Sequence, residues 1–224
     1  MAKTVPIAIV GMSCRLPGGA NSPEQLWEML HAGRSGHGPI PETRWNADAF
    51  YHGDPGARES VPFRTGHFLQ GDDISAFDAR FFRVAPRDAN GMDPQQRLLL
   101  EATYEALENA GMTLDAVRGS DTAVVMAEFA RDYDRMAQKD VPNVHKMHVL
   151  GYGDAILANR ISYTMDLRGP SFTLDTGCVC LSHYMPLIGT LLTLFSRAAW
   201  WPSIRPARAS GPASPVWPLR AGAS

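Results

Sequence analysis

Cys178 is the residue of this sequence whose surroundings are most typical of a nucleophile. The run that precedes it, residues 170–174, is largely apolar, and Gly177 stands directly before the thiol. Glycine adopts backbone angles that a side chain would forbid, so this spacing predicts a tight turn from a strand into a helix. The positive end of that helix would stabilise a thiolate at its start. A buried structural cysteine is the alternative that the local pattern leaves open.

Other potentially reactive side chains have structural interpretations. Cys14 follows a predicted strand and is expected to be a core or loop thiol. Cys180 lies two residues after Cys178, but one such pair without a second cysteine pair is weak evidence for a metal or redox site. His145 and His148 fall in a predicted polar loop without ligand spacing, so we expect neither to be catalytic.

The composition is that of a globular protein. The chain has 224 residues, of which 45% are hydrophobic and 20% charged, with a net charge of −2. This balance suggests neither a nucleic-acid partner nor a membrane surface. Three irregularly spaced cysteines argue against a disulfide framework and fit a reducing compartment. No targeting pattern follows Met1 and no apolar run is long enough to span a membrane, so we expect a cytoplasmic protein.

Strands and helices alternate along the predicted chain, which indicates an α/β fold. Ser22, Asp93 and Asp154 are expected to cap the three clearest helices, and a proline follows each of the first two caps. The predicted strands cover residues 5–10, 122–127 and 170–174, and the predicted helices cover residues 23–32, 94–110 and 154–161.

The helix over residues 94–110 has the strongest periodicity. Its apolar side chains recur at helical spacing, while Arg97, Glu101 and Glu105 are expected on the exposed face. In the first helix, Leu26, Trp27 and Leu30 supply the predicted apolar stripe.

The remaining segments are predicted to be mostly irregular. Residues 36–56 are expected to form a long surface excursion, residues 63–69 a short hairpin arm and residues 129–147 a loop with some helix. Asp88 is expected in a turn.

Three stretches together resemble one known family. They read IAIVGMSCRLPG (residues 7–18), FFRVAPRDANGMDPQQRL (residues 81–98) and ANRISYTMDLRGPSFTLDTGC (residues 158–178). In this order and spacing they resemble the β-ketoacyl synthase domain at the N-terminus of iterative, reducing fungal polyketide synthases. The resemblance covers about residues 4–178.

The resemblance implies a thiolase-like fold in alternating αβαβα layers, of which this chain would hold the N-terminal half. It implies that Cys178 takes an acyl group as a thioester and that the acyl group then condenses with a decarboxylating malonyl unit. Acyl groups in this family arrive on carrier phosphopantetheine, so no directly bound cofactor and no metal are expected. An acyl carrier domain and a ketosynthase-type dimer are the implied partners. Asp175 and Thr176 are expected to shape the turn.

The resemblance also places two histidines and a lysine in the second half of the domain. These groups serve decarboxylation and carbanion stabilisation, and a second-half backbone donor completes the oxyanion hole. We therefore expect residues 1–224 alone to be inactive in condensation.

The sequence departs from the family after Cys178. Residues 179–224 are rich in Pro, Ala, Ser and Arg without a sustained apolar period, which is typical of chain that forms no core. Codons allowed for the later part of this tail can, one base out of frame, spell the helix that the family places after its cysteine. We therefore divide the chain into residues 1–178, the N-terminal part of a β-ketoacyl synthase, and an irregular non-family tail. The tail is predicted to be translated intron over 179–195 and out-of-frame exon over 196–224.

Two further functions stay open at this point. The chain could be a non-catalytic interaction protein that associates with a full-length synthase. A weaker alternative is a cysteine hydrolase, which would need a histidine and an acid beside Cys178.

Overall fold

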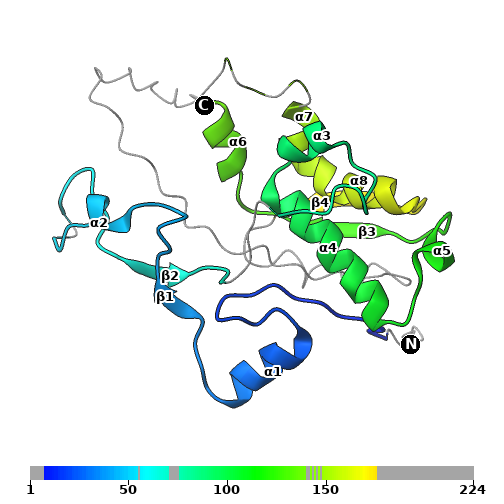
Figure 1. Ribbon diagram of the computed structural model, residues 1–224, viewed down its shortest axis with the longest axis horizontal. Coiled ribbons are helices and arrows are strands. Elements are labelled where there is room, and N and C mark those ends of the chain that lie inside the picture. Colours follow the sequence, from blue (N-terminus) through cyan, green and yellow to red (C-terminus); the bar gives the residue numbers. More distant parts are fainter. Residues whose placement is uncertain are drawn as a thin grey trace, which may run out of the picture.

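The computed structural model describes residues 8–54, 56–70, 76–139, 142, 144, 146 and 148–175. Figure 1 shows a mixed α/β architecture in which α4 runs beneath a pair of short strands. The helices are α1 (Pro23–His31), α2 (Ala47–Phe50), α3 (Pro86–Asn90), α4 (Pro94–Asn109), α5 (Leu114–Val117), α6 (Asp132–Ala137), α7 (His148–Tyr152) and α8 (Asp154–Met165). The strands are β1 (His37–Pro39), β2 (Thr65–His67), β3 (Val124–Ala127) and β4 (Ser171–Leu174).

The longest helix, α4, begins and ends where the sequence predicts. The Asp93 side chain accepts a hydrogen bond from the Gln95 backbone N–H at 2.7 Å, and Pro94 occupies the first helical position. Gly111 follows the helix with a φ of 69°, a left-handed conformation that glycine adopts without strain. The predicted cap and stop signals are both confirmed.

Two of the three predicted strands form a parallel pair. Val124 of β3 pairs with Ser171 of β4, and Ala127 pairs with Leu174. Parallel neighbours need a long crossover connection, and here α6, α7 and α8 lie in that connection. The pairing brings the carboxyl end of β4, which leads toward Cys178, beside the carboxyl end of β3.

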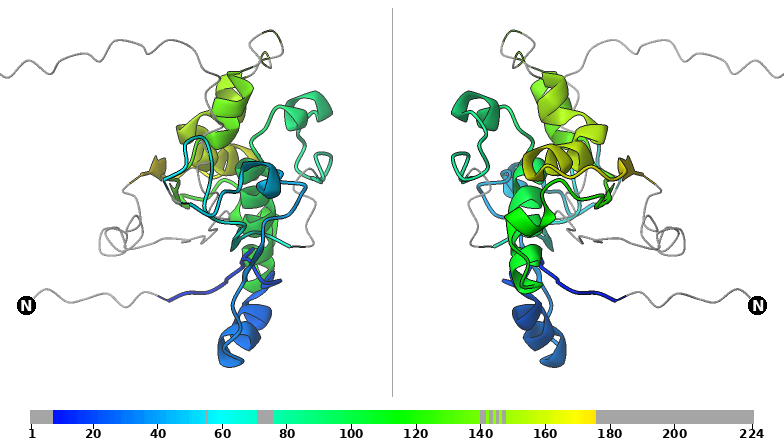
Figure 2. Two further views of the ribbon diagram at one scale, coloured as in Figure 1. Left: turned by 90° about the vertical axis from the view of Figure 1, so that its left-hand side faces the viewer. Right: turned by 90° about the vertical axis from the view of Figure 1, so that its right-hand side faces the viewer.

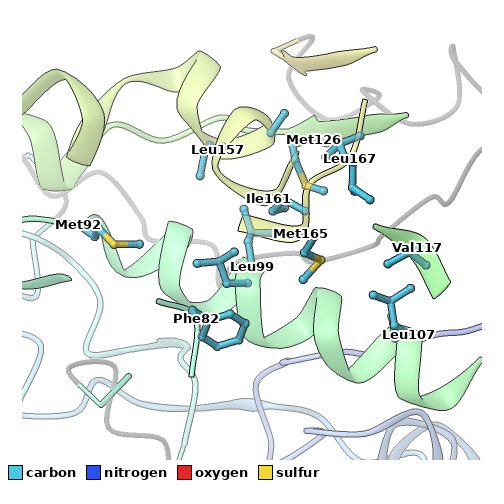
Figure 3. Packing of buried hydrophobic residues seen from close by; sticks show 14 residues of the cluster. Phe82, Met92, Leu99, Leu107, Val117, Met126, Leu157, Ile161, Met165 and Leu167 are labelled. Carbon is cyan, nitrogen blue, oxygen red and sulfur yellow. The ribbon is translucent and has the colours of Figure 1, made fainter. Parts of the chain in front are cut away.

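The hydrophobic core lies where α8 packs between α4 and the strand pair. Figure 3 shows side chains from α4, α8 and β3 meeting in this space. The largest fully buried apolar side chains are Met92, Leu100, Leu107, Val124, Ile161 and Met165. The Thr103 hydroxyl is also buried, but it donates to the Leu99 carbonyl one helical turn earlier at 2.6 Å. The polar group therefore costs little inside this core.

The predicted buried strand over residues 5–10 is wrong for the part that the structure describes. Residues 8–10 are not in a strand, and Ile9 and Val10 are 70% and 59% exposed. The segment that follows lies along α4 instead, where the Ser13 hydroxyl donates to the Ala102 carbonyl at 2.7 Å. A Cβ on Gly11 would stand 2.2 Å from the Ala106 carbonyl oxygen, so only glycine fits this approach. Contact with a helix has replaced the expected pairing in a sheet.

The first helix has the predicted cap but not the predicted buried stripe. The Ser22 hydroxyl accepts from the Gln25 backbone N–H, and Gly33 follows the helix with a φ of 62°. However, α1 buries none of its residues, and Trp27 and Leu30 are 68% and 61% exposed. Figure 2 shows the cause, since α1 projects from the end of the described body, away from the core helices.

The predictions for the connecting segments are confirmed. In the described part of residues 36–56, the helices and strands are limited to the short elements β1 and α2. Within 63–69, β2 pairs antiparallel with β1. Within 129–147, the short helix α6 is the main described element. No helix in the described part of the chain is both long and apolar enough to cross a membrane.

Candidate active site

The predicted nucleophile lies just beyond the described chain. Cys178 and Cys180, like His145, fall outside the described residues, whereas β4 and Asp175 lie within them. The Leu174 carbonyl accepts a hydrogen bond from the Glu128 backbone N–H at 3.0 Å, which extends the strand pairing by one residue beyond Ala127. The carboxyl ends of parallel strands are where open α/β sheets commonly bind ligands. This edge, with Glu128 on one strand and Asp175 on the other, is the candidate site.

Glu128 is the most perturbed acid at this edge. Burial, together with the nearby carboxylates of Asp154 and Asp93, raises the pKa of its carboxyl to about 8, although the Arg131 guanidinium acts in the opposite direction. Its Oε2 atom is buried and has no hydrogen-bond partner among the described residues. Glu128 is therefore largely protonated at neutral pH. Glu128 is not among the residues predicted from the sequence, although its position directly after a predicted strand could have indicated it.

Asp93 combines a structural role with an unusual proton affinity. Burial raises the pKa of its carboxyl to about 6, although the hydrogen bonds that it accepts from Gln95 act to lower this pKa. Its backbone N–H donates to the Gly151 carbonyl at 2.9 Å, which ties the start of α4 to α7. The predicted cap is confirmed. Asp88, by contrast, lies within the short helix α3 rather than in a simple turn.

The prediction that Asp154 caps α8 is wrong. Gly153 occupies the cap position without a side-chain hydrogen bond, and Asp154 is the first helical residue. The Asp154 carboxylate instead forms an ion pair with Arg131, which lies between β3 and α6. A guanidinium competes well for a carboxylate because the hydrogen bond is charge-assisted.

Gln96 and Arg160 join two of the three family-like stretches. The Arg160 Nε donates to Gln96 Oε1 at 3.2 Å, and a terminal guanidinium nitrogen of Arg160 donates to the Leu150 carbonyl at 2.8 Å. The Gln96 amide nitrogen donates to the carbonyls of Leu150 and Gly151. Burial lowers the pKa of the Arg160 guanidinium. These bonds hold the end of α7 against α4 and α8.

The remaining stretch, residues 7–18, contacts the C-terminal half of α4. Arg15 forms a two-pronged ion pair with the Glu105 carboxylate, and the Met12 backbone N–H donates to Asn109 Oδ1 at 2.9 Å. The described parts of all three stretches therefore meet at α4, although they lie far apart in sequence.

The other predicted candidates have positions consistent with structural roles. The Cys14 thiol is half-buried and lies 3.5 Å from the Ala20 carbonyl, and burial raises the pKa of this thiol. A raised pKa disfavours the reactive thiolate. His148 begins α7 rather than lying in a loop, and its Nε2 lies 2.9 Å from Asp134 Oδ1. Within the described ranges, no group of three or more His, Cys, Asp or Glu side chains could hold a metal ion.

Comparison with known proteins gives the same family for most of the chain. The family described as "Beta-ketoacyl synthase, N-terminal domain" matches residues 4–180. The highly reducing polyketide synthase SAT13 of Stachybotrys chartarum is 56% identical over 175 residues, which are 78% of this chain and 7% of that protein. The highly reducing polyketide synthase sdnO of Sordaria araneosa is 55% identical over 179 residues, 80% of this chain and 6% of that protein. The chain thus spans less than a tenth of the length of these curated relatives.

Solved structures agree with the sequence matches. An oxazolomycin ketosynthase domain of Streptomyces albus superposes with a TM-score of 0.67 at 32% identity, covering 77% of this chain and 29% of that one. The ketosynthase from module 6 of the Bacillus subtilis bacillaene synthase gives a TM-score of 0.64 at 34% identity, covering 77% of this chain and 27% of that one.

Proposed function

Because this chain belongs to the β-ketoacyl synthase family, we propose that it is the first part of a condensing enzyme of polyketide synthesis and that Cys178 is its acyl-accepting thiol. The likeness to solved ketosynthases confirms the predicted thiolase-like fold, of which this chain supplies the N-terminal part. The acyl group would arrive on the phosphopantetheine arm of a carrier domain, and the complete enzyme would condense it with a malonyl unit. A ketosynthase-type dimer is part of the same proposal.

The chemistry proposed for Cys178 is an exchange of thioesters. The thiolate attacks the carbonyl carbon of the carrier thioester, a new carbon–sulfur bond forms at Cys178, and the bond to the phosphopantetheine sulfur breaks. That sulfur leaves as a thiolate and takes up a proton. No oxidant or metal is needed, because the acyl carbon keeps its oxidation state.

The observation that carries the proposal is the parallel pairing of β3 with β4. The pairing extends to Glu128 and Leu174, so the chain leaves the sheet at Asp175, three residues before Cys178. An active nucleophile needs a rigid element that fixes where its turn begins. The hydrogen bond from the Ser171 hydroxyl to Asn159 Oδ1, at 2.8 Å, ties the other end of β4 to α8.

We further propose that residues 1–224 alone accept an acyl group at most and do not condense it. The chain covers 29% of a solved ketosynthase chain, and the family resemblance assigns the histidines and lysine of the condensation step to the part that is not matched. Residues 179–224 are proposed to be translated intron followed by out-of-frame exon. Sequencing of the spliced transcript tests this, since reads that all retain the bases encoding 179–195 would contradict it.

Mass spectrometry tests the acyl transfer. The full chain is incubated with an acyl N-acetylcysteamine thioester, a short mimic of the phosphopantetheine arm, and its peptides are then analysed. We expect the acyl mass on Cys178 in the wild type and in Cys180→Ala and Cys14→Ala, and its loss in Cys178→Ala. Acylation of Cys14 or Cys180 at the same rate would show that no selective nucleophile exists.

A further inference from the structure

Two histidines face each other across the β1–β2 ribbon. His37 is the first residue of β1 and His67 the last residue of β2, and the antiparallel register places them directly opposite each other. Their ring centroids are 5.1 Å apart, with an angle of 66° between the ring planes. Both residues are exposed. Figure 1 shows the ribbon apart from α4, α8 and the β3–β4 pair, so the two histidines lie away from the candidate active site.

The phase of the strand pairing brings the two imidazoles close. The Ile40 backbone N–H donates to the Arg64 carbonyl at 3.0 Å, and such bonds join every second pair of residues in an antiparallel ladder. His37 lies three positions before Ile40, so His37 and His67 form a non-hydrogen-bonded pair. In agreement with this, the His37 N–H donates to Ser35 Oγ at 3.1 Å and not across the ribbon. Side chains approach more closely in non-hydrogen-bonded pairs than in hydrogen-bonded ones.

Buried neighbours fix the backbone of both histidines. Gly36, directly before His37, is buried, and a Cβ there would stand 2.6 Å from the Pro17 carbonyl oxygen. Phe68, directly after His67, is also buried. The imidazoles themselves are exposed, and the torsion that turns a histidine ring has a broad minimum. The two rings can therefore reorient on a fixed backbone, which lowers the entropy cost of binding a ligand between them.

The spacing of the two rings matches one metal ion held between them. A metal ion bound at about 2 Å from an imidazole nitrogen lies about 3.2 Å from the ring centroid. Two imidazoles on one ion then have centroids about 4.5 to 5.2 Å apart, for bond angles from square to tetrahedral. The observed 5.1 Å falls in this range. Turning each ring about the bond that holds it leaves its centroid in place, so no movement of the strands is needed.

The side chains available define the kind of ion. Imidazole nitrogen suits Zn²⁺, Cu²⁺ and Ni²⁺, whereas Mg²⁺ and Ca²⁺ prefer oxygen ligands. Within the described chain, His37 and His67 belong to no metal-binding group of three or more side chains, so water would fill the other positions around the ion. The Arg64 guanidinium pairs with the Asp48 carboxylate at 3.0 Å, which offsets its repulsion of a bound cation.

We propose that His37 and His67 form a two-histidine site for a divalent transition-metal ion, which links β1 to β2. The inference rests on the geometry of the ribbon and does not depend on acyl transfer at Cys178. The alternative is a plain aromatic contact, which stabilises the strand pair without any ligand. The two possibilities differ in whether a metal ion binds to the ribbon and stabilises it.

Calorimetric titration of the full chain with NiCl₂ tests the site, at about pH 8, where an ordinary imidazole is uncharged and can bind a metal. Ni²⁺ is the probe because thiolates favour Zn²⁺ and Cu⁺. We expect the affinity for Ni²⁺ to fall about 100-fold in His37→Gln and in His67→Gln, since each variant loses an intramolecular second ligand. His31→Gln and His52→Gln, at exposed histidines outside the ribbon, are the matched controls and should bind as the wild type does.

Two results of the titration would overturn the proposal. One is the absence of saturable binding by the wild type below about 1 mM Ni²⁺, the affinity range of a single weak ligand. The other is an unchanged affinity in both ribbon variants. The double variant Cys178→Ala/Cys180→Ala is titrated in parallel and should keep the site. Loss of Ni²⁺ binding in that variant would assign the ion to thiols and contradict the proposal.

Hydrogen exchange with mass spectrometry locates the ion. At a free Ni²⁺ concentration about ten times the dissociation constant, residues 36–40 and 64–69 are expected to exchange about tenfold more slowly. Residues 98–109 of α4 should not change, and the double variant His37→Gln/His67→Gln should show no slowing in the ribbon. The proposal fails if Ni²⁺ leaves exchange of the ribbon unchanged in the wild type, or slows it equally in the double variant.

Discussion

Gln96 and Arg160 lie 64 positions apart in the sequence, yet their side chains hydrogen bond at 3.2 Å. Gln96 is 1% exposed and its amide nitrogen reaches two carbonyls of α7, while Arg160 reaches the first of these carbonyls from α8. The pair thus joins three helices through polar groups within the fold. Buried polar groups of this kind stabilise one arrangement only when all are satisfied.

Arg160→Met is predicted to destabilise the fold by about 2 kcal/mol. Methionine keeps much of the apolar stem but removes the donors to Gln96 and to the Leu150 carbonyl, so a buried amide oxygen loses its partner. Urea denaturation followed by circular dichroism measures the change in the free energy of unfolding. Arg168→Met, at an exposed arginine, is the control and is expected to stay within about 0.5 kcal/mol of the wild type. Equal stabilities of the two variants would show that the Gln96–Arg160 contact is not stabilising.

Gly151→Ala is predicted to cost about 3 kcal/mol or more. A Cβ at this position would lie 2.1 Å from the Gly91 carbonyl oxygen, which belongs to the backbone and cannot swing away. Gly38→Ala is the matched control, since its Cβ would meet only the end of the Gln70 side chain at 3.7 Å. The same denaturation experiment compares the two, and a near-neutral Gly151→Ala would mean that α7 can move away from the start of α4.

Elements with strong local signals were predictable. The cap at Asp93, the stop at Gly111 and the existence of strands β3 and β4 follow from capping chemistry and short apolar runs, which depend on near neighbours in sequence. The thiolase-like fold came from the three family-like stretches rather than from these elements. Residues 5–10 show the limit, because an apolar run predicts burial only if another strand is available to pair with it.

The polar side of the site could not be predicted from local pattern. Arg97 was expected on the exposed face of α4 and is buried, because α7 covers the start of this helix. Asp154 has the composition of a helix cap but pairs with Arg131, a partner that lies 23 positions earlier. Such choices depend on contacts between distant segments, which a single sequence does not reveal.

Leu100→Ala and Leu30→Ala are predicted to differ sharply although both remove the same atoms from a helix. Leu100 is fully buried in the core of α4 and α8, so its truncation should cost about 3 kcal/mol through lost burial and a cavity. Leu30 lies on the exposed face of α1, where the change should stay within about 0.5 kcal/mol. Thermal or urea unfolding measures both. A large cost at Leu30 would indicate that the α1 stripe is covered in solution.

Asp93→Asn is predicted to make stability less sensitive to pH. Burial raises the pKa of Asp93 to about 6 in the folded protein, above that of an unfolded aspartate, so the folded state binds the proton more tightly. The contribution of Asp93 to stability is therefore present in acid and is lost as the pH rises through about 6. Asparagine caps a helix as well as aspartate does but cannot ionise.

The free energy of unfolding of Asp93→Asn, relative to the wild type, should therefore rise by about 1 to 2 kcal/mol between pH 5 and pH 8. Urea titrations at several pH values measure this difference directly. Asp78→Asn is the matched control. The Asp78 carboxylate likewise accepts a backbone hydrogen bond, from the Phe81 N–H, but it is exposed, whereas the Asp93 carboxyl is buried. Its profile should run parallel to that of the wild type. If the Asp93→Asn profile also runs parallel to the wild type, the Asp93 carboxyl is already charged in the folded protein at pH 5, and burial does not control its proton.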